Sequence, residues 1–230
     1  MLDPLRANDP RLGHYLDSLP HYRAWLEREL DAVRRAAPTA DVALATASIY
    51  LGIKLCDADR HAARVTTEAY TLPRKANALR EYLSGWVHLS AALDGFVFAG
   101  YGALDALAQV AVRVCAVVPD EEVKFPALER LLARAPAQAP AAAALAVVRA
   151  TLAADWFHDL RRLRNLVNYR SVLPAAPAGA LPLGQARAAW ADPPLPGLDR
   201  LDALAPYTRA TLAQVAATVE ALLAGLAATR

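Results

Sequence analysis

Apolar residues recur along most of the chain at intervals of three and four positions, which is the spacing of one buried face of an α-helix. Pro20 follows Ser18 where a first helix can begin, and the apolar face of that helix ends near Pro38. We expect Thr39 to cap a second helix and Pro73 to open a third. Patterns typical of β-strands are nearly absent, so the chain is predicted to be all-α.

The most apolar stretch, residues 94–118, is apolar around most of its circumference and is predicted to be the central helix. Three glycines lie within two turns of it: Gly95, Gly100 and Gly102. Glycine costs about 1 kcal/mol in a helix interior, so they indicate close backbone approach or a kink. The polar residues Asp105, Gln109 and Arg113 are four positions apart and form one row. That row is either the solvated strip of the helix or the wall of a functional groove.

The second half of the chain repeats the helical pattern. The sequence FPALERLLAR predicts a short helix, and an alanine-rich segment leads into a longer one that ends at Val167. The prolines of residues 171–198 predict a long loop before a C-terminal helix at 199–230, broken or capped near Pro206. The expected core stripe of the longer helix is Leu145, Val148, Leu152, Trp156, Leu160, Leu163 and Val167. We therefore expect a single-domain, all-α helical bundle of about six or seven helices over residues 1–230.

Composition narrows the class of protein. Hydrophobic residues make up 56% of the chain and charged residues 21%, which is typical of a folded globular protein. The formal charge of +2 gives no global attraction to nucleic acid or membranes, so any such binding needs a local patch. Cys56 and Cys115 lie in apolar surroundings and are expected to act as small hydrophobes. With no secretory signal and no uninterrupted apolar run of about 18 residues, we expect a soluble cytoplasmic protein.

The common signatures of metal and nucleotide sites are absent. The sequence has no GxxxxGK[ST], HExxH or CxxC motif, and its GFVFAGYG segment has the wrong spacing for a dinucleotide-binding loop. The segment CDADRH gathers metal-ligating residue types, but we expect it at a solvated helix exit, without convergent ligands from a second element. We therefore expect no metal and no cofactor.

The densest polar cluster is LRRLRNLVNYRS, at residues 160–171. His158, Arg162, Asn165 and Tyr169 fall at i, i+4, i+7 and i+11 of a helix and form a polar stripe. Arginines in the last turn of a helix also interact favourably with its dipole, by about 0.3 to 1 kcal/mol. The cluster is therefore either a solvated helix end or the remains of a catalytic site.

This stretch resembles bacterial HEPN-type helical domains, which carry an Arg-Asn-x-x-x-His signature near the end of a helix. The upstream helix YGALDALAQVAVRV, followed by WFHDLRRLRNLVNYRS, extends the resemblance over roughly residues 80–173. It places the signature arginine on Arg164, the asparagine on Asn165 and the histidine position on Tyr169. Such domains bury the motif at a two-fold dimer interface, and their ribonucleases use the histidine and arginine at the RNA 2′-hydroxyl and phosphate.

The tyrosine at the histidine position changes the expected function. A phenol with an ordinary pKa of about 10 is a poor general base at neutral pH. The resemblance therefore implies a non-catalytic homodimer that binds RNA or a protein partner. One alternative is a metal-independent RNA endonuclease of toxin or defence type that uses Arg164, Asn165 and Tyr169, and another is a helical protein that binds a small molecule or cofactor. The candidate binding residues are His158, Arg161, Arg162, Arg170, Asp105 and Gln109.

Overall fold

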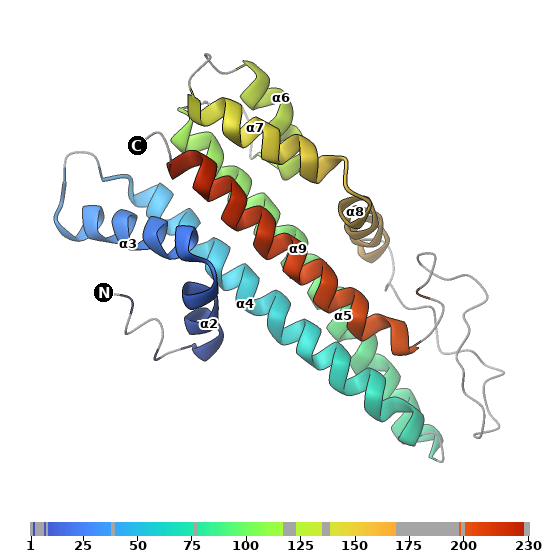
Figure 1. Ribbon diagram of the computed structural model, residues 1–230. Helices are drawn as coiled ribbons and strands as arrows, with labels where there is room; N and C mark the ends of the chain where they lie inside the picture. The colour runs from blue at the N-terminus through green and yellow to red at the C-terminus, as the bar shows by residue number, and fades with distance from the viewer. Residues whose placement is uncertain are drawn as a thin grey trace.

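The protein is all-α in the part of the chain that the structure describes. A computed structural model describes the following residues: 2, 7, 9–37, 40–75, 78–116, 123–134, 139–168, 198 and 201–227. These residues form eight α-helices and one short 3₁₀ helix, with no strand among them (Figure 1). The all-α prediction is confirmed, although the helices are more numerous than the six or seven expected.

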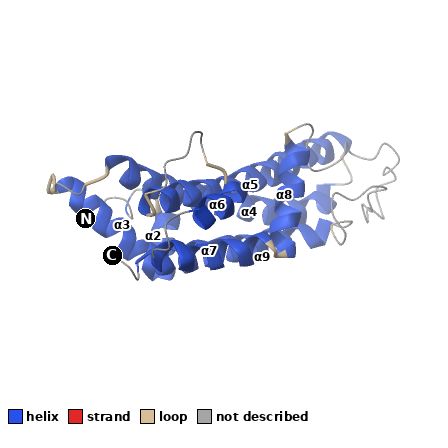
Figure 2. Cartoon of the chain, turned by 90° about the horizontal axis from the view of Figure 1, so that it is seen from above, coloured by secondary structure: helices blue, strands red, loops and turns tan. Residues whose placement is uncertain are grey.

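Two long helices form the centre of the structure. Helix α4 (Val42–Thr71) and helix α5 (Leu79–Val114) pack along each other and are joined through the 3₁₀ helix η1 (Leu72–Lys75) (Figure 1). Helix α9 (Leu201–Ala227) packs against both, and α7 (Ala139–Leu152) lies beside α9 on the same side of the pair (Figure 2). Pro73 lies inside η1, so the prediction that it opens the third helix is wrong by about six residues.

The starts of the helices near the N-terminus follow the sequence prediction in part. Helix α3 (Pro20–Arg34) begins at Pro20, as predicted. The predicted cap Thr39 lies outside the described residues, and the N-cap of α4 is Asp41, whose Oδ1 accepts a hydrogen bond from Leu44 N at 3.0 Å. A carboxylate suits this position because it also interacts favourably with the positive end of the helix dipole.

The sequence analysis missed α2 (Pro10–Ser18), which packs on the middle of α4. Asp9 caps α2 and pairs with Arg60 of α4, while Arg11 Nε lies 3.0 Å from Asp59 Oδ2. The CDADRH segment is therefore the middle of a 30-residue helix, and the expected helix exit is wrong. Its charged residues hold α2 in place.

The long helix predicted before Val167 is two helices, α7 (Ala139–Leu152) and α8 (Asp155–Val167). A straight helix would put Val148 and Phe157 about 180° apart, since nine residues at about 100° each separate them. Both are fully buried. The extended backbone of Ala154 (φ −82°, ψ 136°) makes the change of direction that allows this.

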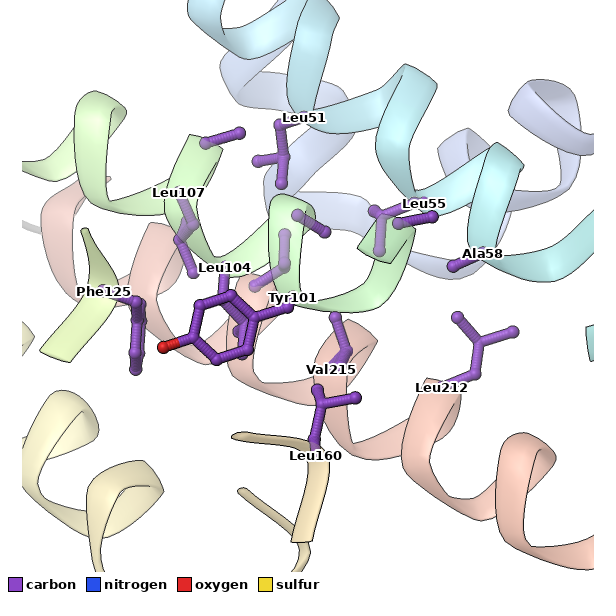
Figure 3. Packing of buried hydrophobic residues seen from close by; sticks show 14 of the residues in the cluster. Leu51, Leu55, Ala58, Tyr101, Leu104, Leu107, Phe125, Leu160, Leu212 and Val215 are labelled. Carbon is purple, nitrogen blue, oxygen red and sulfur yellow. The ribbon is translucent and has the colours of Figure 1, made fainter. Parts of the chain in front are cut away.

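Aromatic residues join three of these helices in the core. The ring of Phe157 in α8 lies 6.1 Å from that of Tyr101 in α5 and 5.8 Å from that of Phe125, the first residue of α6 (Phe125–Arg134). Figure 3 shows Tyr101 between Phe125 and Leu160. Offset and tilted aromatic pairs of this kind stabilise beyond the area they bury. Phe157 therefore takes the core position predicted for Trp156, which is only partly buried.

Helix α9 runs without interruption through Pro206, so the predicted break is wrong. Pro206 is the sixth residue of the helix, where its missing N–H costs only one bond near the N-terminus. The predicted apolar side is confirmed, because each of the following residues is buried: Leu212, Val215, Val219, Leu222, Leu223 and Leu226.

Two of the helices in the described part of the chain have the length and composition of a membrane span. They cover Arg80–Val114 and Leu201–Ala227, with mean hydropathy 1.4 and 1.5 in their most apolar windows. The window in the first helix is 72% buried against the rest of the protein, as in the core helix of a water-soluble fold, and that in the second is 39% buried. Long apolar helices occur both in membranes and in the cores of water-soluble proteins, so length and composition are weak evidence for either.

The glycines of α5 differ in what surrounds them. A Cβ added at Gly95 would lie 2.3 Å from the His61 ring, whereas a Cβ at Gly100 would meet nothing within 4 Å. We expect Gly100→Ala to raise the free energy of unfolding by about 0.5 to 1 kcal/mol, because alanine favours a helix interior. Gly95→Ala should gain less or destabilise, because His61 must move. Urea denaturation of both variants tests this, and equal effects would contradict the packing of His61 on α5.

Candidate functional site

A cleft of about 370 Å³ lies where α4, α5 and α8 meet the start of α6. Helix α5 supplies the floor, α4 forms one wall, and Arg164 of α8 with Lys124 forms the other. The described lining residues are Ala47, Tyr50, Lys54, Phe98, Tyr101, Gly102, Asp105, Ala106, Gln109, Lys124 and Arg164. Three of the residues selected from the sequence, Asp105, Gln109 and Arg164, therefore meet at one site.

Arg164 reaches the cleft from the last turn of α8. Its side chain is half-buried, and its guanidinium carbon lies 5.2 Å from the centre of the Tyr101 ring. This cation–π contact holds the guanidinium group beside the Tyr101 ring in the cleft. Within the described part of the chain Arg164 has no carboxylate partner, so its N–H donors remain able to bind an anion.

The polar row of α5 anchors the segment that leads into α6. Asp105 Oδ1 accepts a hydrogen bond from Phe125 N at 2.9 Å, and Gln109 Nε2 donates to Val123 O at 2.7 Å. Arg113 is the third member of the row, and its Nη1 lies 3.9 Å from Asp41 Oδ2. The row is thus both a structural anchor and, at Asp105 and Gln109, a wall of the cleft.

Residues of α4 complete the site, and sequence reasoning missed them. Tyr50 and Lys54 are one helical turn apart, and Lys54 Nζ lies 5.0 Å from the centre of the Tyr50 ring. The Lys54 methylenes pass over Gly102, where an added Cβ would lie 3.4 Å from Lys54 Cδ. One signal was available, because Lys54 and Lys124 are two of only three lysines in the chain.

The charge of the cleft is predominantly positive. Lys54, Lys124 and Arg164 line it with one carboxylate, Asp105, whose Oδ2 lies 3.7 Å from Lys124 Nζ. Burial, together with the charge of Asp105, raises the pKa of Tyr101, and the arginines of α8 oppose that shift. Tyr101 therefore stays a neutral phenol at physiological pH and contributes no negative charge.

The other described candidates of α8 do not line this cleft. His158, Arg161, Arg162 and Asn165 are exposed on α8. Tyr169 and Arg170 lie outside the described residues. Arg164 and its neighbour Asn165 therefore point to different surroundings, as expected for consecutive residues about 100° apart on a helix.

Other chemical groups offer weaker sites. No group of three or more His, Cys, Asp or Glu side chains gathers among the described residues as a metal site would require. Both cysteines are buried, and burial raises the pKa of the Cys56 thiol to about 12, which disfavours the nucleophilic thiolate. The cleft is thus the best candidate for binding.

Comparisons with protein-family models, curated proteins and solved structures found no match to this chain.

Proposed function

We propose that this protein is a HEPN-like, single-domain helical bundle that binds RNA without cleaving it. The phosphate backbone would lie in the cleft against Arg164, Lys54 and Lys124. The observation that carries the proposal is the convergence on one cleft of three cations from α4, α8 and the segment that leads into α6. A net positive site of this kind is what phosphate binding requires in a chain whose overall charge is only +2.

The chemistry of the cleft favours binding over catalysis. RNA cleavage by attack of the 2′-hydroxyl on the adjacent phosphate needs a group that accepts the hydroxyl proton near neutral pH. No histidine lines the cleft among the described residues, and His158 is exposed elsewhere on α8. The one carboxylate, Asp105, is already engaged by Phe125 N and Lys124. These groups can hold a phosphodiester but are poorly suited to activate its neighbouring hydroxyl.

We also propose, from the HEPN resemblance, that the protein is a cytoplasmic homodimer. The chain mass is 24.6 kDa, so light scattering coupled to size exclusion distinguishes a monomer from twice that mass. A strict monomer at micromolar concentration would remove the dimer from the proposal and leave the cleft of a single chain as the binding unit.

Removing one cation from the cleft tests the function. We expect Arg164→Ala to weaken binding of a fluorescein-labelled single-stranded RNA by about tenfold, since a charge-assisted contact to phosphate contributes about 1.4 kcal/mol. Fluorescence anisotropy at fixed salt measures the affinity. The affinity should also fall with increasing salt, because phosphate contacts release counterions.

Arg162→Ala is the matched control, because Arg162 is on the same helix but exposed away from the cleft. It removes the same charge and should change the affinity less than about threefold. Equal losses in the two variants would contradict the assignment of the cleft. The same RNA incubated with and without EDTA should stay intact, whereas EDTA-insensitive cuts that require Arg164 would favour the endonuclease alternative.

A further inference from the structure

The cleft has features that phosphate binding alone does not require. Tyr50 and Phe98 line it with large rings that are 49% and 48% exposed. Exposing an aromatic ring to water is unfavourable, and most large rings among the described residues are buried. The positive charges of the cleft therefore lie beside solvent-facing ring surfaces, an arrangement typical of sites that hold both a phosphate and a base.

From this we infer that the cleft is a nucleotide-sized subsite in which a base stacks on Phe98 while its phosphate binds Lys54 and Arg164. The inference rests on the proposed function, and it adds the base and the residues that recognise it. Tyr50 and Lys54 come from α4, outside residues 80–173 to which the HEPN resemblance applies. This part of the site therefore depends on the structure rather than on the resemblance.

The two aromatic residues have different roles. The Tyr50 ring is already engaged by the ammonium group of Lys54 on the neighbouring turn, which positions that cation at the wall. Phe98 has no such contact with a cation among the described residues, so its face is available to a base. Stacking of a base on an aromatic ring raises affinity by about fivefold to 150-fold, which makes Phe98 the larger contributor to base binding.

The size of the cleft limits the ligand to about one nucleotide. A volume of about 370 Å³ is near the lower end of small-ligand pockets, which hold one compact molecule. Gly102 and Ala106 on the floor project no long side chain into the cleft, which leaves room for a planar ring beside the Lys54 methylenes. The nucleotide could be free in solution or one residue of an RNA strand, because both present the same base and phosphate.

Calorimetric titration with four probes tests the inference. The probes are adenosine 5′-monophosphate, ribose 5-phosphate, a single-stranded oligoadenylate decamer and the same decamer with abasic residues. We expect each ligand with bases to bind at least about fivefold more tightly than its counterpart without them, which corresponds to the lower end of base stacking. Phe98→Leu should remove most of that difference, and Lys54→Met should weaken all phosphate ligands.

The matched control is Leu83→Ala, because Leu83 is 44% exposed on the same helix but does not line the cleft. It should leave all four affinities unchanged. Equal affinities for adenosine monophosphate and ribose phosphate, and for the two decamers, would overturn the subsite. If Arg164→Ala still weakened binding of the decamers in that case, the proposed RNA binding would remain supported. Tight mononucleotide binding that depends on Phe98, with no decamer binding, would support the subsite and overturn the RNA proposal.

Discussion

Replacing Phe157 by alanine is expected to lower the free energy of unfolding by about 3 to 5 kcal/mol, the usual cost of deleting a fully buried aromatic side chain. Phe157 is 0% exposed and lies against the rings of both Tyr101 and Phe125. Its loss would open a cavity where α5, α6 and α8 meet, beside Tyr101, the ring that Arg164 contacts in the cleft. Denaturant unfolding followed by circular dichroism measures the change.

Trp156→Ala is the matched variant, because it removes a larger ring at the adjacent position. Trp156 is only partly buried, so we expect about half the loss or less. The comparison tests the bend at Ala154 as well as the packing. If Trp156→Ala were the more damaging change, the single straight helix predicted from the sequence would be the better description.

The bend between α7 and α8 shows where prediction from periodicity stops. The spacing from Leu145 to Val167 fits one continuous face, and no glycine or proline marks a break at Ala153 or Ala154. We attribute the break to tertiary packing, since a straight helix would put the buried residues Val148 and Phe157 on opposite faces. By contrast, α3 and α9 follow their apolar patterns closely, because a single buried stripe determines each of them.

The candidate site was only partly predictable for a related reason. Asp105 and Gln109 could be selected as polar residues four positions apart on an otherwise apolar helix, and Arg164 as part of a polar cluster that resembles the HEPN signature. Tyr50 and Lys54 gave no such signal, since their place in the cleft depends on how α4 packs against α5. A sequence pattern shows which face of a helix is apolar, but not which residues of a second helix lie opposite.

The start of α3 is a second place where long-range packing decides local structure. Its N-cap residue, Leu19, offers no side-chain acceptor. Glu220 of α9 supplies one instead: its Oε1 accepts from His21 N at 2.8 Å and its Oε2 accepts from Tyr22 N at 3.1 Å. Glu220→Ala should lower the free energy of unfolding by about 2 kcal/mol, because two helix N–H groups lose a charged acceptor. Thermal and urea unfolding measure this loss.

Two further variants separate the cap from general effects of charge. Glu220→Gln keeps one oxygen acceptor but loses the charge that the helix dipole favours, so it should cost about half as much. Glu129→Ala removes an exposed carboxylate that pairs with Arg149 at 3.0 Å, and exposed pairs of this kind contribute little. Equal small losses in Glu220→Ala and Glu129→Ala would contradict the cap. A large loss at Glu220 alone would mean that α9 holds α3 in place through its first turn, across 199 residues of sequence.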